Sequence, residues 1–226
     1  MALKDFALAK PKPLPVILLA DVSGSMAEEG KITALNAAVR DMLETFSKES
    51  RLRAEIQVAI VTFGGDARVH LPLTPVHELP PVGDFVADGG TPMGAALTLA
   101  CQMVEDKDLI PSRSCRPAII LVSDGYPTDA WESAFEDFCA SERSQKATRF
   151  AMAIGGDADE GMLNNFINDK EAPVFRAHRA RDIHRFFRAV SMSISSRSQR
   201  QNPDETAPLF IPPPPDDDFD QDFDIA

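Results

Sequence analysis

One short stretch, Val16-Ile-Leu-Leu-Ala-Asp-Val-Ser-Gly-Ser-Met26, constrains the fold more than any other part of the chain. Five apolar residues run without interruption into Asp21, which is typical of a strand buried on both faces of a sheet. Ser23 and Ser25 then follow at every second position. Open α/β sheets bind their ligands at the carboxyl ends of the strands, so we expect these three side chains to form part of a binding site there.

The rest of the chain alternates between apolar strand patterns and amphipathic helix patterns. Strands are predicted at about 14–20, 55–63, 67–71, 117–123, 149–154 and 173–175, and helices at about 31–49, 92–106, 130–146, 159–168 and 181–196. The segment 67–71 follows a Gly-Gly-Asp turn, which indicates a hairpin edge strand. The pattern predicts an α/β fold with a doubly wound, mostly parallel sheet and helices on both faces.

Three separated segments of this predicted sheet offer hard oxygen donors. They are Asp21 with Ser23 and Ser25, then Thr91 in a Gly-Gly-Thr-Pro loop, and Asp124 directly after the strand at 117–123. Pro92 suits the first turn of a helix, and we also expect Thr91 to be its N-cap. Two carboxylates and three hydroxyls suit Mg²⁺, while Mn²⁺ and Ca²⁺ stay open as alternatives. With so few carboxylates, the metal would stay electrophilic enough to accept a further carboxylate from outside the chain.

Taken together, these three motifs resemble the metal-ion-dependent adhesion site (MIDAS) of von Willebrand factor A domains, and the likeness covers residues 14–196. The resemblance implies six strands in the order 3-2-1-4-5-6 with one antiparallel edge strand. It implies that Ser23, Ser25 and Thr91 bind the metal directly or nearly so. It also implies that Asp21 and Asp124 act as direct ligands or one step removed from the metal.

A narrower resemblance is to the TerY group of bacterial A domains, which is linked to tellurium resistance, stress response and phage defence. It rests on Leu14-Pro-Val-Ile-Leu-Leu-Ala-Asp, Ala34-Leu-Asn-Ala-Ala-Val and Phe186-Phe-Arg-Ala-Val-Ser-Met-Ser-Ile-Ser195. This likeness implies a Ser/Thr kinase and a PP2C-type phosphatase as partners. The zinc-ribbon extension of some members has no cysteines to build it here.

The chain divides by composition into a lead-in at 1–13, one domain at 14–197 and a Pro-rich acidic tail at 198–226 that we expect to be disordered. Residues 201–226 carry eight acidic side chains and no Lys or Arg, so they account for −8 of the net charge of −12. A domain with the remaining −4 has no basic surplus for nucleic acid. The Asp/Phe-rich end of the tail suggests a partner-binding peptide, an intramolecular plug for the metal or a solubilising tail.

The three cysteines are widely spaced and form no C-x-x-C pair, which favours a reducing compartment. The chain shows no signal peptide and no membrane-spanning segment, so we expect a cytoplasmic location.

The leading hypothesis is a non-enzymatic module that holds a partner protein through a Mg²⁺-bridged Asp or Glu. The alternative is a Mg²⁺-dependent hydrolase or phosphatase, because Asp21 follows the first strand as the nucleophile of haloacid-dehalogenase-type phosphatases does. Those enzymes use Asp-x-Asp, whereas this chain has Ser23 at the second position. A structural scaffold with an empty site is the third alternative.

Overall fold

A computed structural model describes residues 10–49, 53–169 and 172–205 of the 226-residue chain. The strands are β1 Lys12–Asp21, β2 Ala54–Gly64, β3 Asp66–Pro75, β4 Ala118–Ser123, β5 Thr148–Ile154 and β6 Phe175–Ala177. The α-helices are α1 Lys31–Ser47, α2 Met93–Glu105, α3 Trp131–Ala140, α4 Glu142–Lys146, α5 Glu160–Phe166 and α6 Ala180–Gln199. Two short 3₁₀ segments are η1 Gly24–Gly30 and η2 Val76–Glu78.

The six strands form one sheet in the order β3-β2-β1-β4-β5-β6. Strand β3 pairs antiparallel with β2, and every other pair is parallel. The predicted fold class and strand order are therefore confirmed. β1 lies between β2 and β4, so the polar residues after β1 lie at the centre of the sheet's carboxyl edge.

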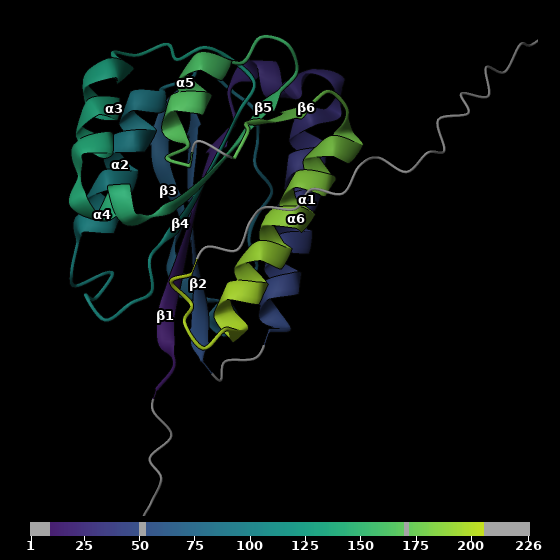
Figure 1. The fold of residues 1–226 in the computed structure, drawn as a ribbon. Helices are drawn as coiled ribbons and strands as arrows, with labels where there is room; N and C mark the ends of the chain where they lie inside the picture. Colours follow the sequence, from purple (N-terminus) through teal and green to yellow (C-terminus); the bar gives the residue numbers. More distant parts are fainter. Residues whose placement is uncertain (1–9, 50–52, 170–171, 206–226) are drawn as a thin grey trace, which may run out of the picture.

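Helices cover both faces of the sheet because β1 is apolar on both sides. Leu14, Val16 and Leu18 alternate onto one face and belong to the core cluster that includes the buried sides of α1 and α6. Ile17 and Leu19 point to the opposite face, where α2, α3 and α5 supply the core. Figure 1 shows α1 and α6 side by side on one side of the sheet and α2 to α5 on the other. The result is a three-layer arrangement with two separate hydrophobic cores.

Two predicted elements are wrong in detail. The helix expected at 130–146 is two helices, because Ser141 has an extended backbone (φ −61°, ψ 130°) and caps α4 by accepting a hydrogen bond from the Ser144 amide. The last strand lies at Phe175–Ala177 instead of 173–175.

Helix α6 extends two residues past the predicted domain end at 197. Arg197 is fully buried, and its guanidinium donates to the carbonyl oxygens of Pro203 (3.1 Å) and Arg116 (2.8 Å). The Asp204 carboxylate accepts a hydrogen bond from the Arg116 amide (2.7 Å). Residues 198–205 are therefore held against the domain, and the predicted disorder of the tail otherwise falls on 206–226, outside the described residues. Similarly, β1 already begins within the predicted lead-in.

None of the helices in the described ranges is both long and apolar enough to cross a membrane.

Candidate metal centre

Asp21 is the last residue of β1, and its side chain is completely buried. One carboxylate oxygen accepts a hydrogen bond from the Ser23 amide (2.8 Å), and the other accepts one from the Ser123 hydroxyl (2.6 Å). Burial raises the pKa of Asp21, and the nearby charge of Asp124 acts in the same direction, although the two serines oppose the shift. The carboxylate therefore fixes the turn after β1 and links it to the end of β4.

The predicted ligands from the two central strands meet at Asp124. The Ser25 hydroxyl donates to one Asp124 carboxylate oxygen at 2.8 Å, and the Ser23 hydroxyl lies 3.4 Å from the same oxygen. The two hydroxyl oxygens are 3.1 Å apart. Asp124 and Ser23 are buried, whereas Ser25 is exposed. Ser25 thus forms the outer side of the cluster, where a ligand can approach from solvent.

Lys31, the first residue of α1, was not predicted to belong to the site. Its ammonium nitrogen lies 2.9 Å from the second Asp124 carboxylate oxygen, and only 15% of its side chain is exposed. A cation at a helix N-terminus is unfavourable because of the helix dipole. A lysine at that position, with no acidic residue in the first turn of α1, is therefore the sequence signal that could have revealed this contact.

Thr91 lies beside this cluster but does not act as the predicted N-cap. Helix α2 begins at Met93, and its free amides at Gly94 and Ala95 are capped by the Asp129 carboxylate at 3.0 Å each. Asp129 comes from a loop 35 residues away, so the sequence pattern around Thr91 could not reveal it. Thr91 is buried, and its hydroxyl oxygen lies next to Gly125 instead. A Cβ built on Gly125 would be 3.8 Å from that oxygen.

Close contacts between glycines hold the neighbouring loops together. Gly24 donates its amide to the Gly89 carbonyl oxygen (2.9 Å), and Gly65 donates to Gly90 (2.9 Å). Gly89 has φ +70°, and a Cβ there would lie 2.4 Å from the Gly65 Cα. A Cβ on Gly64 would lie 2.3 Å from the Val22 carbonyl oxygen. The Gly-Gly pairs are therefore required for the loop of Thr91 to approach the loop of Ser23.

The donor set fits a hard divalent cation. The Ser23 and Ser25 hydroxyls converge on the Asp124 carboxylate, with Asp21 and Thr91 in the adjoining loops, and all five groups are oxygen donors of the kind that Mg²⁺ prefers. The Lys31 ammonium shows that the Asp124 carboxylate already stabilises a positive charge from within the chain. In the described residues, no three His, Cys, Asp or Glu side chains gather into a group that could hold a metal.

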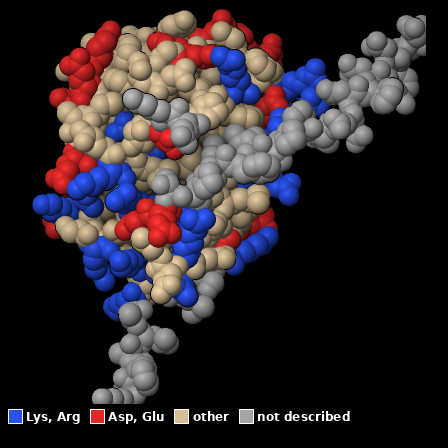
Figure 2. Space-filling view, in the orientation of Figure 1, with Lys and Arg blue, Asp and Glu red and all other residues tan. Residues whose placement is uncertain are grey.

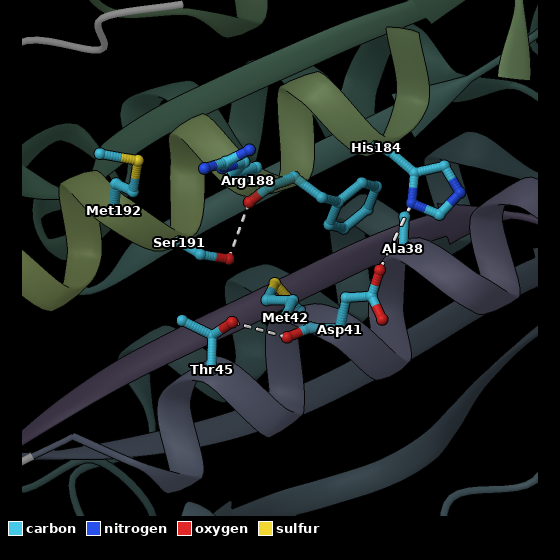
Figure 3. Close-up of a pocket in the computed structure, with 9 residues that line it drawn as sticks. Ala38, Asp41, Met42, Thr45, His184, Arg188, Ser191 and Met192 are labelled. Carbon is cyan, nitrogen blue, oxygen red and sulfur yellow. Dashed lines mark hydrogen bonds and ion pairs between the residues drawn. The ribbon is translucent and has the colours of Figure 1, made fainter. Parts of the chain in front are cut away.

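A hollow of about 460 Å³ lies elsewhere, between α1 and α6. Figure 3 shows the Thr45 and Ser191 hydroxyls facing it, but each donates to a carbonyl oxygen of its own helix. Asp41 and His184 face each other there at 3.5 Å. None of the predicted metal ligands lines this groove, so it is separate from the site.

Comparison with known proteins gives the same fold. Residues 16–127 match the profile of the family described as "von Willebrand factor type A domain". Similar solved structures include a von Willebrand factor type A protein from Catenulispora acidiphila, with 22% identity and a TM-score of 0.63 over 81% of this chain and 42% of that one. BatB from Bacteroides thetaiotaomicron has 18% identity and a TM-score of 0.57 over 81% of this chain and 98% of that one.

A third structure is proximal thread matrix protein 1 from the mussel byssus, described with a zinc-occupied MIDAS motif. It has 14% identity and a TM-score of 0.59 over 80% of this chain and 48% of that one. The chain spans less than half of the length of this protein and of the Catenulispora protein. No curated protein matched the sequence. At these identities the structural likeness establishes the fold alone.

Proposed function

Because this chain carries a von Willebrand factor type A domain, we propose that it is a non-enzymatic, metal-dependent binding module. It holds a partner protein through a magnesium ion that bridges the site to an Asp or Glu of the partner. The convergence of the Ser23 and Ser25 hydroxyls on the Asp124 carboxylate carries this proposal. Such a site supplies few negative charges, so a bound cation keeps affinity for one more carboxylate.

The roles that we propose for the site residues follow from how deeply each one is buried. Both Asp21 carboxylate oxygens accept hydrogen bonds, from the Ser23 amide and the Ser123 hydroxyl, so Asp21 would orient the loop that holds a metal. Ser25 and Asp124 offer oxygens on the solvent side of the cluster, with the Thr91 loop beside them. When bound, the metal supplies Lewis acidity toward an incoming carboxylate.

The rim of the site offers apolar surface for a partner. Tyr126, two residues after Asp124, is 65% exposed, and Val86, in the loop that reaches Asp88, is 76% exposed. The Asp88 amide donates to the Val22 carbonyl oxygen (2.8 Å), so this loop lies against the turn that follows β1. Aromatic residues are enriched in protein interfaces. We infer that Tyr126 contacts the partner next to the bridging carboxylate.

The biological setting that we propose rests on the resemblance to the TerY group. It is a cytoplasmic bacterial stress-response system, for tellurite resistance or phage defence, in which a Ser/Thr kinase and a PP2C-type phosphatase are the candidate partners. The TerY-like segments at 14–21, 34–39 and 186–195 support this assignment.

A Mg²⁺-dependent hydrolase or phosphatase is the alternative, because Asp21 follows the first strand of an α/β sheet as a phosphatase nucleophile does. Against it, position 23 is a serine, which cannot act as a general acid near neutral pH. Both Asp21 oxygens also accept hydrogen bonds within the chain. Turnover on a panel of phosphoesters would support the alternative.

The test combines metal binding with partner capture. We expect Ser23→Ala with Ser25→Ala to abolish MgCl₂ binding in calorimetry and to abolish chelator-sensitive capture of proteins from a lysate, identified by mass spectrometry. Thr45→Ala with Ser47→Ala is the matched control, because these hydroxyls are exposed and donate only within α1. Capture that persists in EDTA would contradict the mechanism.

A further inference from the structure

A polar pocket of about 370 Å³ lies at the end of the sheet opposite to the metal site. It is formed where β4 begins, by Ser114 and Arg116, together with the end of α2 and the short helix α4. None of the predicted metal ligands lines it. The pocket therefore has no part in the function proposed above.

Two buried polar atoms in this pocket lack partners. The Arg143 guanidinium donates through Nη2 to the Ile110 carbonyl oxygen (2.7 Å), but its Nη1 atom is buried without a hydrogen bond. The Ser114 hydroxyl is also buried without a partner. Unsatisfied buried donors are costly, and most are paired in folded proteins. The wall of this pocket therefore holds unsatisfied donor groups beside its cationic side chains.

The pocket has a basic surplus in an acidic protein. Four cationic side chains and two carboxylates line it, and the cations are Lys107, Arg116, Arg143 and Lys146. Glu142 pairs with Lys146 (2.6 Å), and Glu105 accepts hydrogen bonds from the Ser141 hydroxyl and the Arg143 amide. Figure 2 shows Lys and Arg side chains gathered around α4 and the start of β1. The two carboxylates are thus already engaged, and the remaining positive charge favours an anionic ligand.

We propose that the acidic segment 216–224 of the same chain, Asp-Asp-Asp-Phe-Asp-Gln-Asp-Phe-Asp, docks in this pocket. It carries six carboxylates and no cation. The described chain ends at Glu205, and the preceding Asp204 is bonded to Arg116 on the wall of the pocket. The tail therefore leaves the domain next to the pocket.

The connecting segment is long enough for this docking. Residues 206–215 span up to about 33 Å when extended, at roughly 3.3 Å per residue. A short tether of this kind gives an effective concentration on the order of millimolar, so even weak charge pairing suffices to keep the segment bound. The pairing is electrostatic, so salt weakens it.

Hydrogen–deuterium exchange of the full chain tests the proposal. We expect amides in 107–116 and 142–147 to exchange at least fivefold more slowly in the natural chain than in a variant with the six aspartates of 216–224 changed to Asn. Lys107→Glu with Arg116→Glu, or NaCl at about 0.5 M, should give the same loss of protection. Arg68→Glu, on the exposed part of β3, is the control, and this variant should keep the slow amide exchange of the natural chain.

The second measurement is the binding of a peptide of residues 212–226 to the full chain that carries the six Asn substitutions. We expect saturable binding that Lys107→Glu with Arg116→Glu weakens at least tenfold and Arg68→Glu leaves within twofold. Equal exchange rates in the natural and Asn-substituted chains would overturn the proposal. So would tail-dependent protection at 22–25 and 124–126, because that would place the segment on the metal site. Inorganic phosphate that binds as tightly as the peptide would also overturn it.

Discussion

Removing the Lys31 ammonium should strengthen metal binding. In the fold, this group lies 2.9 Å from the Asp124 carboxylate and competes for the charge that a metal needs. Lys31→Met keeps an unbranched apolar side chain of similar length at the first position of α1. It also removes an unfavourable cation from a helix N-terminus, which is worth about 0.3–1 kcal/mol.

The size of the effect follows from the ion pair. At 2.9 Å, Coulomb's law gives about 1.4 kcal/mol in water and about 6 kcal/mol at an effective dielectric constant of 20. The ammonium regains hydration when it leaves, so the net cost of displacing it is close to that of a hydrogen bond to a charged group, about 1.5–3 kcal/mol. We therefore expect Lys31→Met to bind Mg²⁺ roughly ten- to hundredfold more tightly than the natural chain.

Isothermal titration with MgCl₂ measures this directly, and thermal unfolding gives a second readout. Without metal, Lys31→Met should unfold at a lower temperature, because Asp124 is then buried with only serine hydroxyls as partners. Mg²⁺ should raise its Tm more than that of the natural chain. Lys48→Met is the matched control, since Lys48 pairs with Glu44 at 2.6 Å on the exposed surface of α1. Mg²⁺ affinities of the Lys31→Met variant and the natural chain that agree within twofold would refute the reasoning. If neither protein bound metal, the proposed function itself would fail.

Two further predictions concern stability. Gly89→Ala should lower the free energy of unfolding in urea by more than about 2 kcal/mol, because of the positive φ and the 2.4 Å approach to Gly65; Gly83→Ala, with open space around it, should change it by under about 1 kcal/mol. Burial raises the pKa of the Cys115 thiol from 9.0 to about 11. Because the thiol ionises more readily in the unfolded chain, the difference in pKa leaves the folded state at full stability below about pH 9. The free energy of unfolding then falls as the pH rises from 9 toward 11. Between pH 8 and pH 10.5, the Tm of Cys115→Ala should fall less than that of the natural chain; parallel curves would contradict this.

The sheet could be predicted because its signals are local. The unbroken apolar run into Asp21 identifies a strand with helices on both faces, and its alternating residues do divide between two cores. The break at Ser141 was missed because a helical pattern continues on both sides of it. The end of α6 was missed because Arg197, a residue type that is usually exposed, is fully buried by contacts with Arg116 and Pro203.

The sequence predicted residues that the fold brings together, and their role as metal ligands stays a prediction, but it did not predict the contacts around them. Asp21, Ser23 and Ser25 could be identified from their spacing in the sequence, and the fold places Asp124 next to the two serines. The Asp129 cap joins residues 35 positions apart, and no spacing in the sequence encodes it. The Lys31 contact joins residues 93 positions apart, and the lysine at the start of α1 signals an ion pair without naming Asp124 as the partner. Such contacts depend on how loops from different strands pack, which the strand pattern leaves undetermined.

Lys31 should weaken metal binding but strengthen the binding of a partner carboxylate to the metal-loaded site, because of the charge balance there. The Asp21 and Asp124 carboxylates together balance one divalent cation, so a Lys31 ammonium that has moved aside leaves the loaded site with one positive charge. A single Asp or Glu of a partner would restore neutrality. Lys31→Met should therefore bind Mg²⁺ more tightly yet capture a carboxylate-bearing partner less tightly at saturating Mg²⁺, by roughly two- to fivefold for a partly exposed charge. Acetate titrated into the Mg²⁺-saturated proteins provides a simple probe of this difference. Equal or tighter acetate binding by the variant would show that Lys31 only competes with the metal and does not help to select the partner.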